Sequence, residues 1–534
     1  MNGDATDGRQ RGSEEERGIT RRDALRGGLA GGVLLASGGL LSGLGGLPQA
    51  SAASPKIKRG GALMIGATGG GPSDSIDAHF ATSDPDISRL WQLYEPLGVR
   101  DPNFNFQYRL AESMTPGKVP NVWTVKLRPG VTFHNGKPLT SADVIYSLRR
   151  ILNPKKPGTG AASIGYVDLG KTKALDAHTV QIALTIPNVG FPDDIGQYFN
   201  GIVPVGYNPK SPVGTGPFKY QSFTAGQRSV FVKNPHYWDG VPHVDSVTII
   251  DFSDDTAKVN ALLSNQVHAI TNLPAANLSQ VQGNAAYKAL VSQCGAWQPF
   301  TMRVDQAPFS DVRVRQAMRL IVNRPQMIEQ ALAGQGRVAN DLYAPYDPAY
   351  DSALAQRHQD LAQAKSLLKA AGHSGLTVQL TTAPVYQGIV QAAEVFAQQA
   401  SGAGVKVKLN QTDSATFYGP NYLKWPFAQD FWFTRNYLGQ VAQGSLPNSP
   451  FNETHWANPQ FQKLIKEAQA QNDTAKRTEL LHAAQQIEYE SGGYIVWSFS
   501  NQLDAYSAAI TGFSPAKSGV PLTNYGFGKV AFVA

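Results

Sequence analysis

The chain has 534 residues, of which 42% are hydrophobic and 16% are charged, and its formal net charge is +7. This length and composition allow a large core in more than one domain, which excludes a disordered or polytopic membrane class. No dense basic run follows Arg26, which argues against nucleic-acid binding, because that function usually needs a clustered basic face. The single cysteine, Cys294, excludes a disulfide framework within one chain, and we expect it to be a buried, inert thiol.

The first 52 residues have the pattern of an export signal. Residues 20–26 carry a twin-arginine pattern, residues 27–47 form a mildly apolar, glycine-rich segment, and Ala50-Ser51-Ala52 offers a cleavage site. The alternative is an uncleaved membrane anchor, which the many glycines disfavour because glycine weakens a helix. No cysteine follows the apolar segment, so we expect no lipoprotein anchor. The sequence therefore predicts a soluble protein exported by the twin-arginine route to the periplasm or beyond.

The stretch from Ala111 to Ile151 predicts a small α+β unit. Residues 122–127 alternate apolar and polar side chains, which is typical of a strand, and residues 131–133 predict a second short strand. Asn135-Gly136 is a strong hairpin signal. Thr140 and Asp143 then predict the capped start of a helix, with apolar residues repeating along one face.

The remaining elements alternate between strands and helices. Asp311 predicts a helix cap, with an apolar face on the helix that follows. A strand, a helix and a strand between 378 and 410 predict a βαβ unit. The other predicted strands are 62–66, 180–186, 244–250 and 494–499, and the other predicted helices are 87–97, 256–263, 361–371, 459–470 and 474–491.

No catalytic motif is present. The sequence contains no G-x-S-x-G, H-E-x-x-H, C-x-x-C or Walker pattern, and its ten histidines are scattered. Catalytic groups can still be assembled from distant residues, so a secreted hydrolase stays open as an alternative. The favoured interpretation is a binding protein with no cofactor and no metal.

Several ordered motifs carry a family resemblance. They are Y-E-P-L at 94–97, A-E-S-M at 111–114 with L-R-P-G-V-T-F-H-N-G-K-P at 127–138, P-V-G-T-G-P-F-K at 212–219, N-P-H-Y-W at 234–238 and P-F-S-D-V-R-V-R-Q-A at 308–317. The chain resembles the family 5 extracellular solute-binding proteins, which are the peptide, dipeptide and nickel binders of ABC importers. The resemblance covers most of residues 57–515.

The resemblance implies an α/β fold of the type II periplasmic-binding-protein class, in which two lobes close on a hinge, with an additional α+β domain. Lobe I would comprise residues 54–97, 213–300 and 501–534, the additional domain II residues 98–212, and lobe III residues 301–500. The implied function is to capture a peptide or peptide-like solute and deliver it to membrane permease subunits, as a monomer. A nickel-chelate or other small-solute binder of the same fold is the alternative.

The resemblance also places the binding cleft. Its walls would come from residues 80–84, 297–303 and 431–439. The candidate ligand-binding residues in these segments are Phe80, Thr82, Ser83, Trp297, Phe300, Arg303, Trp432, Phe433, Arg435 and Asn436. The aromatic candidates could equally be ordinary core residues.

Arg435 departs from the family pattern. Peptide binders of the family place an aspartate shortly after a tryptophan here, to pair with the α-amino group of the peptide. A guanidinium at that position would repel an amine and suit a carboxylate or phosphate. We therefore hypothesise an anionic group on the ligand. The alternative is that Arg435 points to solvent or pairs with Asp430 or Glu453.

Two further features have simpler structural interpretations. Glu95 in the Y-E-P-L motif is expected to be a hydrogen-bond partner rather than a catalytic acid. The stretch 452–459 could touch ligand at 454–456, but a loop leading into a helix capped by Asn458, with Pro459 in the first turn, explains it more simply.

Overall fold

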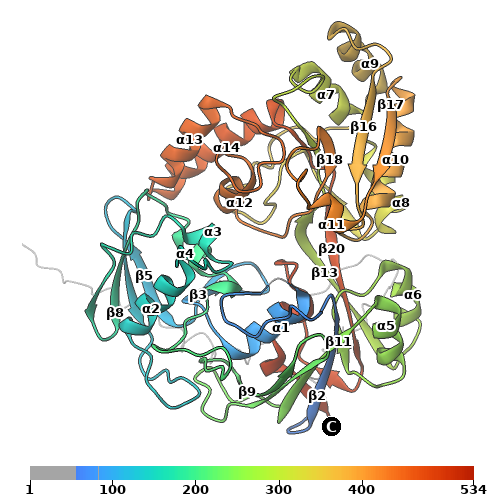
Figure 1. Cartoon of the computed structure of the whole chain (residues 1–534). Coiled ribbons are helices and arrows are strands. Elements are labelled where there is room, and N and C mark those ends of the chain that lie inside the picture. Colours follow the sequence, from blue (N-terminus) through green and yellow to red (C-terminus); the bar gives the residue numbers. More distant parts are fainter. Residues whose placement is uncertain (1–55, 82) are drawn as a thin grey trace, which may run out of the picture. The chain divides into compact units, whose positions relative to one another are not determined.

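The computed structural model describes residues 56–81 and 83–534 (Figure 1). The predicted export signal and the candidate residue Thr82 lie outside the described residues. Three sheets of four or more strands organise the described part, and each has its own hydrophobic core. Among the described residues, no helix is both long and apolar enough to cross a membrane.

The largest sheet has eight strands in the order β13-β20-β12-β2-β11-β10-β9, with β15 paired to β20. Its central pairs, β11 with β2 and β12 with β2, are parallel, and its outer pairs are antiparallel. The strands are β2 (Ala62–Thr68), β9 (Phe218–Thr224), β10 (Arg228–Lys233), β11 (Ser246–Phe252), β12 (Ala269–Ile270), β13 (Tyr287–Trp297), β15 (Gly336–Val338) and β20 (Ser498–Ser507).

Both faces of this sheet are covered by helices. Leu63 and Ile65 of β2 pack with α1 (Asp84–Leu93), while Met64 packs on the other face with α5 (Asp255–Leu263) and α6 (Leu278–Gln282). The alternation along β2 follows from the period of two in a strand. Smaller elements complete this region: β1 (Ile57–Lys58), β21 (Ile510–Thr511), β22 (Ala531–Val533), α15 (Pro521–Tyr525), η3 (Ala275–Asn277) and η4 (Phe527–Lys529).

A four-stranded antiparallel sheet follows, in the order β5-β6-β8-β7, with helix α2 (Ser141–Ile151) packed on it. The predicted strand at 122–127 is confirmed as β6, and the predicted cap of α2 is confirmed, because the Asp143 carboxylate accepts from the Thr140 N–H at 2.9 Å. The other elements are β3 (Gly98–Arg100), β4 (Phe106–Tyr108), β5 (Ala111–Pro116), β7 (Lys173–Asp176), β8 (Thr179–Ala183), α3 (Ala161–Ile164), α4 (Phe191–Ile195) and η2 (Tyr198–Asn200).

The predicted short strand at 131–133 is wrong. Only a single bridge, between Thr132 and Pro138, forms there. The chain turns at Asn135-Gly136 as predicted. The Phe133 N–H then donates to the Lys137 carbonyl and the Leu139 N–H to the Val131 carbonyl, so these backbone groups are paired locally and no regular strand pair forms.

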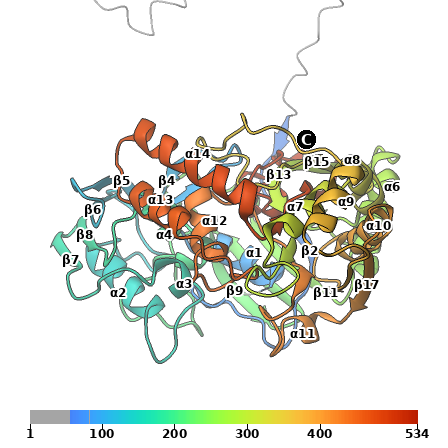
Figure 2. The ribbon, with the colours of Figure 1, turned by 90° about the horizontal axis from the view of Figure 1, so that it is seen from above.

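A five-stranded sheet forms the third layer, in the order β17-β16-β18-β14-β19. Its parallel pair β16 (Thr377–Thr382) and β17 (Lys406–Gln411) flanks α10 (Ile389–Gly402), which confirms the predicted βαβ unit. The remaining strands are β14 (Phe300–Met302), β18 (Phe427–Gln429) and β19 (Tyr494–Ile495), and the remaining helices are α7 (Val312–Ile321), α8 (Arg324–Leu332), α9 (Leu361–Ala370), α11 (Ser414–Phe417), α12 (Tyr437–Gly444), α13 (Pro459–Gln469) and α14 (Thr474–Ser491). Helices α13 and α14 lie side by side (Figure 2).

Two strands connect the eight-stranded and five-stranded sheets. The chain passes from β13 to β14 through Gln298 and Pro299, and from β19 to β20 through Val496 and Trp497. The predicted strand at 494–499 is therefore two strands, one in each sheet. Figure 1 shows β13 and β20 running side by side toward these crossings. The predicted lobe boundaries are not tested by this arrangement and stay a prediction.

Candidate functional site

Two of the predicted cleft segments meet at the crossings. The backbones of Trp297 and Trp432 exchange two hydrogen bonds, at 3.0 and 2.9 Å, outside the regular strands. Their rings stack with centroids 6.0 Å apart, and Tyr343 stacks on Trp297 at 5.1 Å. Both tryptophans are largely buried, so they form a rigid aromatic platform beside the crossing strands.

Arg435 lies over this platform. Its guanidinium carbon is 5.6 Å from the centroid of the Trp432 ring, and the side chain is half-buried. It forms no hydrogen bond or ion pair with any residue that the structure describes; in particular, neither Asp430 nor Glu453 pairs with it. Burial lowers the pKa of Arg435, and nearby Tyr198 and Asp194 act in the opposite direction.

Asp194, the carboxyl whose charge acts on Arg435, does not compensate this charge fully. Burial raises the pKa of Asp194 to about 7, and the repulsion of Asp193 adds to the shift. Asp194 accepts hydrogen bonds from the Tyr166 hydroxyl at 2.5 Å and from the Asn188 amide at 2.9 Å. Near neutral pH this carboxyl is only partly ionised, so the half-buried Arg435 keeps a largely unpaired positive charge.

Asn436 links this segment to helix α4. Its amide donates to the Asp193 carboxylate at 2.6 Å, and Asp193 is also ion-paired with Arg100 at 2.6 Å. Asp193, Asp194 and Tyr198 could not be predicted as neighbours of Arg435, because they lie more than 230 positions before it and follow no motif. The structure thus adds residues of the 98–212 region to the surroundings of the predicted cleft.

The third predicted segment precedes α1. Ser83 caps this helix by accepting from the Asp86 N–H, and Phe80 lies beneath two cations, Arg150 at 5.6 Å and Lys156 at 4.5 Å from its ring centroid. Ser83 therefore has a structural role that accounts for it without a ligand.

An unusual turn supports the start of α1. Four consecutive residues, 522–525, have positive φ between 47° and 59°, a left-handed turn that costs about 1–2 kcal/mol per residue. The turn is fixed by the Leu522 N–H, which donates to Asp504 at 2.8 Å, and by the Tyr525 hydroxyl, which donates to Asp84 at the first position of α1. Tyr198 is close enough to influence the pKa of both Tyr525 and Arg435.

Two of the predicted residues, Phe300 and Arg303, have less to offer a ligand than Phe433. Phe300 has no exposed surface and packs against Phe396 at 4.5 Å in the core of the five-stranded sheet, which favours the core interpretation of this residue over a cleft wall. Arg303 is neutralised by Asp305 at 2.7 Å. Phe433 is 44% exposed and stays a candidate for the cleft wall.

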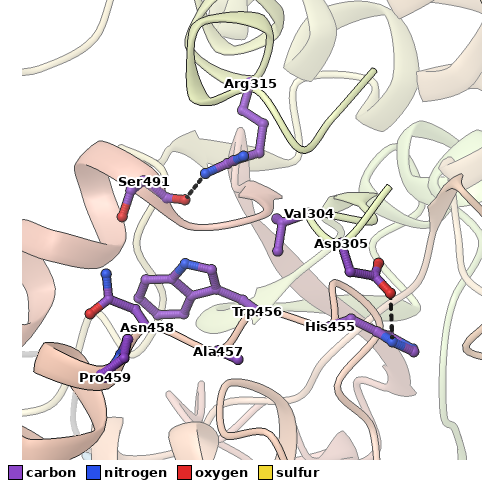
Figure 3. A pocket seen from close by; sticks show the side chains of 9 residues that line it. All are labelled: Val304, Asp305, Arg315, His455, Trp456, Ala457, Asn458, Pro459 and Ser491. Atoms are coloured by element: carbon purple, nitrogen blue, oxygen red, sulfur yellow. Dashed lines mark hydrogen bonds and ion pairs between the residues drawn. The ribbon is translucent and has the colours of Figure 1, made fainter. Parts of the chain in front are cut away.

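A separate open depression of about 390 Å³ lies beside the start of α13 (Figure 3). Its charges are satisfied within the protein, since His455 faces Asp305 at 3.4 Å and Arg315 donates to the Ser491 carbonyl at 2.7 Å. Asn458 caps α13 at 2.9 Å, which confirms the structural interpretation of this loop. None of the nine predicted site residues that the structure describes lines the depression.

No metal centre is evident in residues 56–81 and 83–534, where no group of three or more histidine, cysteine or acidic side chains could hold an ion. Cys294 is buried and donates to the Ser500 carbonyl, and burial raises the pKa of its thiol, as expected for an inert cysteine.

Two sheets covered by helices are joined by two crossing strands, and aromatic and cationic side chains lie at these crossings. This arrangement defines a solute-binding protein of the type II periplasmic-binding class. Residues 105–437 match the family of bacterial extracellular solute-binding proteins, family 5 (middle region), and the chain belongs to this family. The predicted function class, the substrate-binding component of an ABC importer, is thereby confirmed.

Known relatives differ in what they bind. The glutathione-binding protein GsiB of Escherichia coli (strain K12) is 25% identical over 471 residues, covering 82% of this chain and 91% of GsiB. The structure of AgaA from A. tumefaciens R10, in complex with agropinic acid, is 25% identical with a TM-score of 0.75 over 88% of this chain and 99% of AgaA. NikZ from Campylobacter jejuni, in complex with Ni(L-His), is 16% identical with a TM-score of 0.77 over 88% and 99%, and shows the shared fold.

Proposed function

We propose that this protein captures a small peptide-like solute carrying an anionic group and delivers it to the permease of an ABC importer. The observation that carries the proposal is the unpaired guanidinium of Arg435, stacked on Trp432 at the sheet crossings. A half-buried cation whose charge is compensated only in part by Asp194 is costly, so such a group is expected where a ligand supplies the missing charge. Two relatives, one named as a glutathione-binding protein and one solved in complex with agropinic acid, are consistent with a ligand that carries a carboxylate.

The remaining features of the proposal follow from the sequence. The twin-arginine pattern and the Ala50-Ser51-Ala52 site support export and cleavage, which would place the mature chain outside the cytoplasmic membrane without a lipid anchor. We propose a monomer that performs no chemistry on its solute. The nickel-chelate alternative has no specific support from the described side chains.

Native mass spectrometry of the purified protein identifies a solute that co-purifies with it. Calorimetric titration then compares the wild type with Arg435→Ala, using that solute or, failing one, glutathione and a panel of short peptides. Loss of a charge-assisted hydrogen bond is worth about 1.5–3 kcal/mol, so we expect affinity for the bound solute to fall roughly 10- to 100-fold.

The matched control is Arg228→Ala, which removes an exposed arginine on β10. Affinity should be unchanged in this variant. Equal affinity of the wild type and Arg435→Ala would overturn the assignment of an anionic ligand, and turnover of any panel member would favour a hydrolase instead.

A further inference from the structure

Phe104 has an unfavourable backbone conformation. It lies in the loop of the hairpin that β3 and β4 form, here called the 98–108 hairpin, and its φ is 70°. Residues with a Cβ rarely adopt this left-handed conformation, and for a bulky residue it is strained. Glycine would be the locally better residue at this position. Such strain persists only where surrounding contacts hold the residue in place, so the contacts of Phe104 indicate what the strain serves.

The ring of Phe104 is buried outside the hydrophobic cores. It is only 6% exposed, yet it belongs to none of the six clusters of buried apolar residues in the described part of the chain. Its aromatic partner is Tyr346, which lies on the stretch between β15 and α9, and the two ring centroids are 6.2 Å apart. The ring is therefore covered where the hairpin meets a segment that is distant in sequence.

Tyr346 is fixed relative to helix α12. Its hydroxyl donates to the Gln293 carbonyl on β13 at 2.6 Å, which holds the ring in place. The carboxylate of the next residue, Asp347, accepts from the Tyr437 N–H at the first position of α12 at 2.8 Å. The hairpin therefore contacts a residue whose neighbour supports the helix that follows the segment of Arg435.

Arg100 connects this contact with a second one. Its guanidinium donates to the Phe104 carbonyl at 2.8 Å and lies 5.1 Å from the centroid of the Phe104 ring. The same guanidinium forms a two-pronged ion pair with Asp193, at 2.6 and 2.7 Å, a geometry that the planar fork of arginine allows. Asp193 in turn accepts from the Asn436 amide at 2.6 Å. One side chain of the hairpin thus supports two contacts, and both lead to α12.

We propose that Arg100 is a positioning residue for solute capture and that the 98–108 hairpin, which it organises, is a latch. The hairpin holds the segment of Arg435 against the 98–212 region before any solute is present. The strained conformation of Phe104 is kept because it directs the ring onto its partner across this junction. The inference goes beyond the proposed function, since it does not depend on the charge of the solute or on what Arg435 binds.

The latch affects capture through the balance of open and closed forms. A solute binds with a higher apparent affinity when the form that it prefers is already populated. A chain that loses the latch therefore captures its solute less tightly, although no residue that touches the solute has changed.

Double electron–electron resonance measures the latch in the full chain without any solute. Nitroxide labels at Lys173→Cys on β7 and Lys463→Cys on α13, two exposed positions, report the distance between the 98–212 region and α12–α14. Cys294 is buried, so it stays unlabelled. With the latch intact we expect one main distance. In Phe104→Gly we expect the longer distance of an open form to become about tenfold more populated.

Glycine makes this variant informative, because it removes the ring and also relieves the strain of the left-handed conformation. Ala333→Gly is the matched control: it relieves another left-handed residue, with φ of 49°, at an exposed position after α8, and it should leave the distances unchanged. Arg100→Lys keeps the positive charge but loses the two-pronged geometry, so the open form should increase in this variant too. Arg149→Lys, at an exposed arginine on α2, should not change it.

Equal open fractions in the wild type and in Phe104→Gly would overturn the latch. An equal rise in Ala333→Gly would show that relief of backbone strain, rather than loss of the ring contact, changes the distance, and would overturn it as well. Unchanged distances in Arg100→Lys would overturn the positioning role of Arg100. If that variant fails to fold, Asp193→Asn removes the same ion pair and takes its place. Because no solute is added, failure of the latch leaves the proposed function standing, and the titration of Arg435→Ala tests that function separately.

Discussion

His79 shows how a single buried residue makes stability depend on pH. It is fully buried, its Nε2 lies 2.9 Å from the Gly201 carbonyl oxygen, and its Nδ1 lies 2.7 Å from the guanidinium of Arg150. Nδ1 must therefore accept and Nε2 must donate, which is the neutral form. Burial and the charge of Arg150 lower the pKa of His79 to about 4, against the opposing effect of the Gly201 carbonyl.

The sign of the pH dependence follows from that shift. Between pH 4 and 6.5 the unfolded chain binds a proton at His79 that the folded chain excludes, so stability falls as the pH falls through this window. We expect the contribution to reach about 3 kcal/mol. Urea unfolding at a series of pH values should show a shallower dependence for His79→Gln than for the wild type. His178→Gln, at an exposed histidine, should keep the wild-type slope, and parallel profiles for all three proteins would contradict this account.

The local roles of single residues were predictable where the partner is close in sequence. Asp143 and Asp311 cap helices as their patterns indicated. Glu95 was predicted to be a structural partner, and it accepts from Arg109 at 2.7 Å and from Thr215 at 3.0 Å. These partners were not predictable, because they are distant in sequence and only the fold brings them to Glu95.

At the scale of elements, helix α1 is held by a close backbone approach. A side chain on Gly214 would place its Cβ 1.9 Å from the Leu93 carbonyl oxygen, and one on Gly216 would lie 2.4 Å from that of Gln92. The glycines of the P-V-G-T-G-P motif are therefore required by contact with the end of α1. The helix predicted at 87–97 ends earlier, at Leu93, because the backbone of Tyr94 is extended.

Gly214→Ala should consequently destabilise the fold. The added Cβ would clash with the backbone carbonyl of Leu93, and rotating a side chain cannot relieve this clash. We therefore expect the free energy of unfolding, measured by urea denaturation, to fall by about 3 kcal/mol or more. Gly71→Ala is the matched control, because no atom lies within 4 Å of its Cβ position and its φ is not positive. Equal stability of the two variants would refute the close-approach explanation.

Element types could be predicted more securely than the path between sheets. The period of two in 122–127 and the apolar face of 141–151 follow from local periodicity, and both were found. The division of 494–499 into β19 and β20 could not be read from the sequence, because a buried apolar run looks the same whether it stays in one sheet or crosses to another. The pairing of Trp297 with Trp432 depends on the same crossing.

At the scale of the whole described part, the family resemblance predicted the fold class, and the structure and the comparisons confirm it. What the sequence could not supply is the set of contacts that hold distant regions together. Asn436 bonds to Asp193, Asn472 donates to the carbonyls of Gly117 and Lys118, and the Val189 N–H donates to the Gln469 carbonyl at 3.0 Å. These bonds join the 98–212 region to α12–α14, the regions that we expect to separate when the cleft opens.

Asn436→Ala tests whether these contacts act together in such an opening. Removing a hydrogen bond to a partly buried carboxylate is worth about 1.4 kcal/mol, so the open form should become about tenfold more populated. Hydrogen exchange at the Val189 amide should then accelerate about tenfold, because this N–H is protected by Gln469 only while the two regions are in contact. Amides within β6, whose ladder lies inside one sheet, should exchange at the wild-type rate. Asn277→Ala, which removes only a local exposed hydrogen bond, should change neither. Acceleration in β6 as well would indicate general destabilisation, and an unchanged rate at Val189 would show that Asn436 does not hold the two regions together.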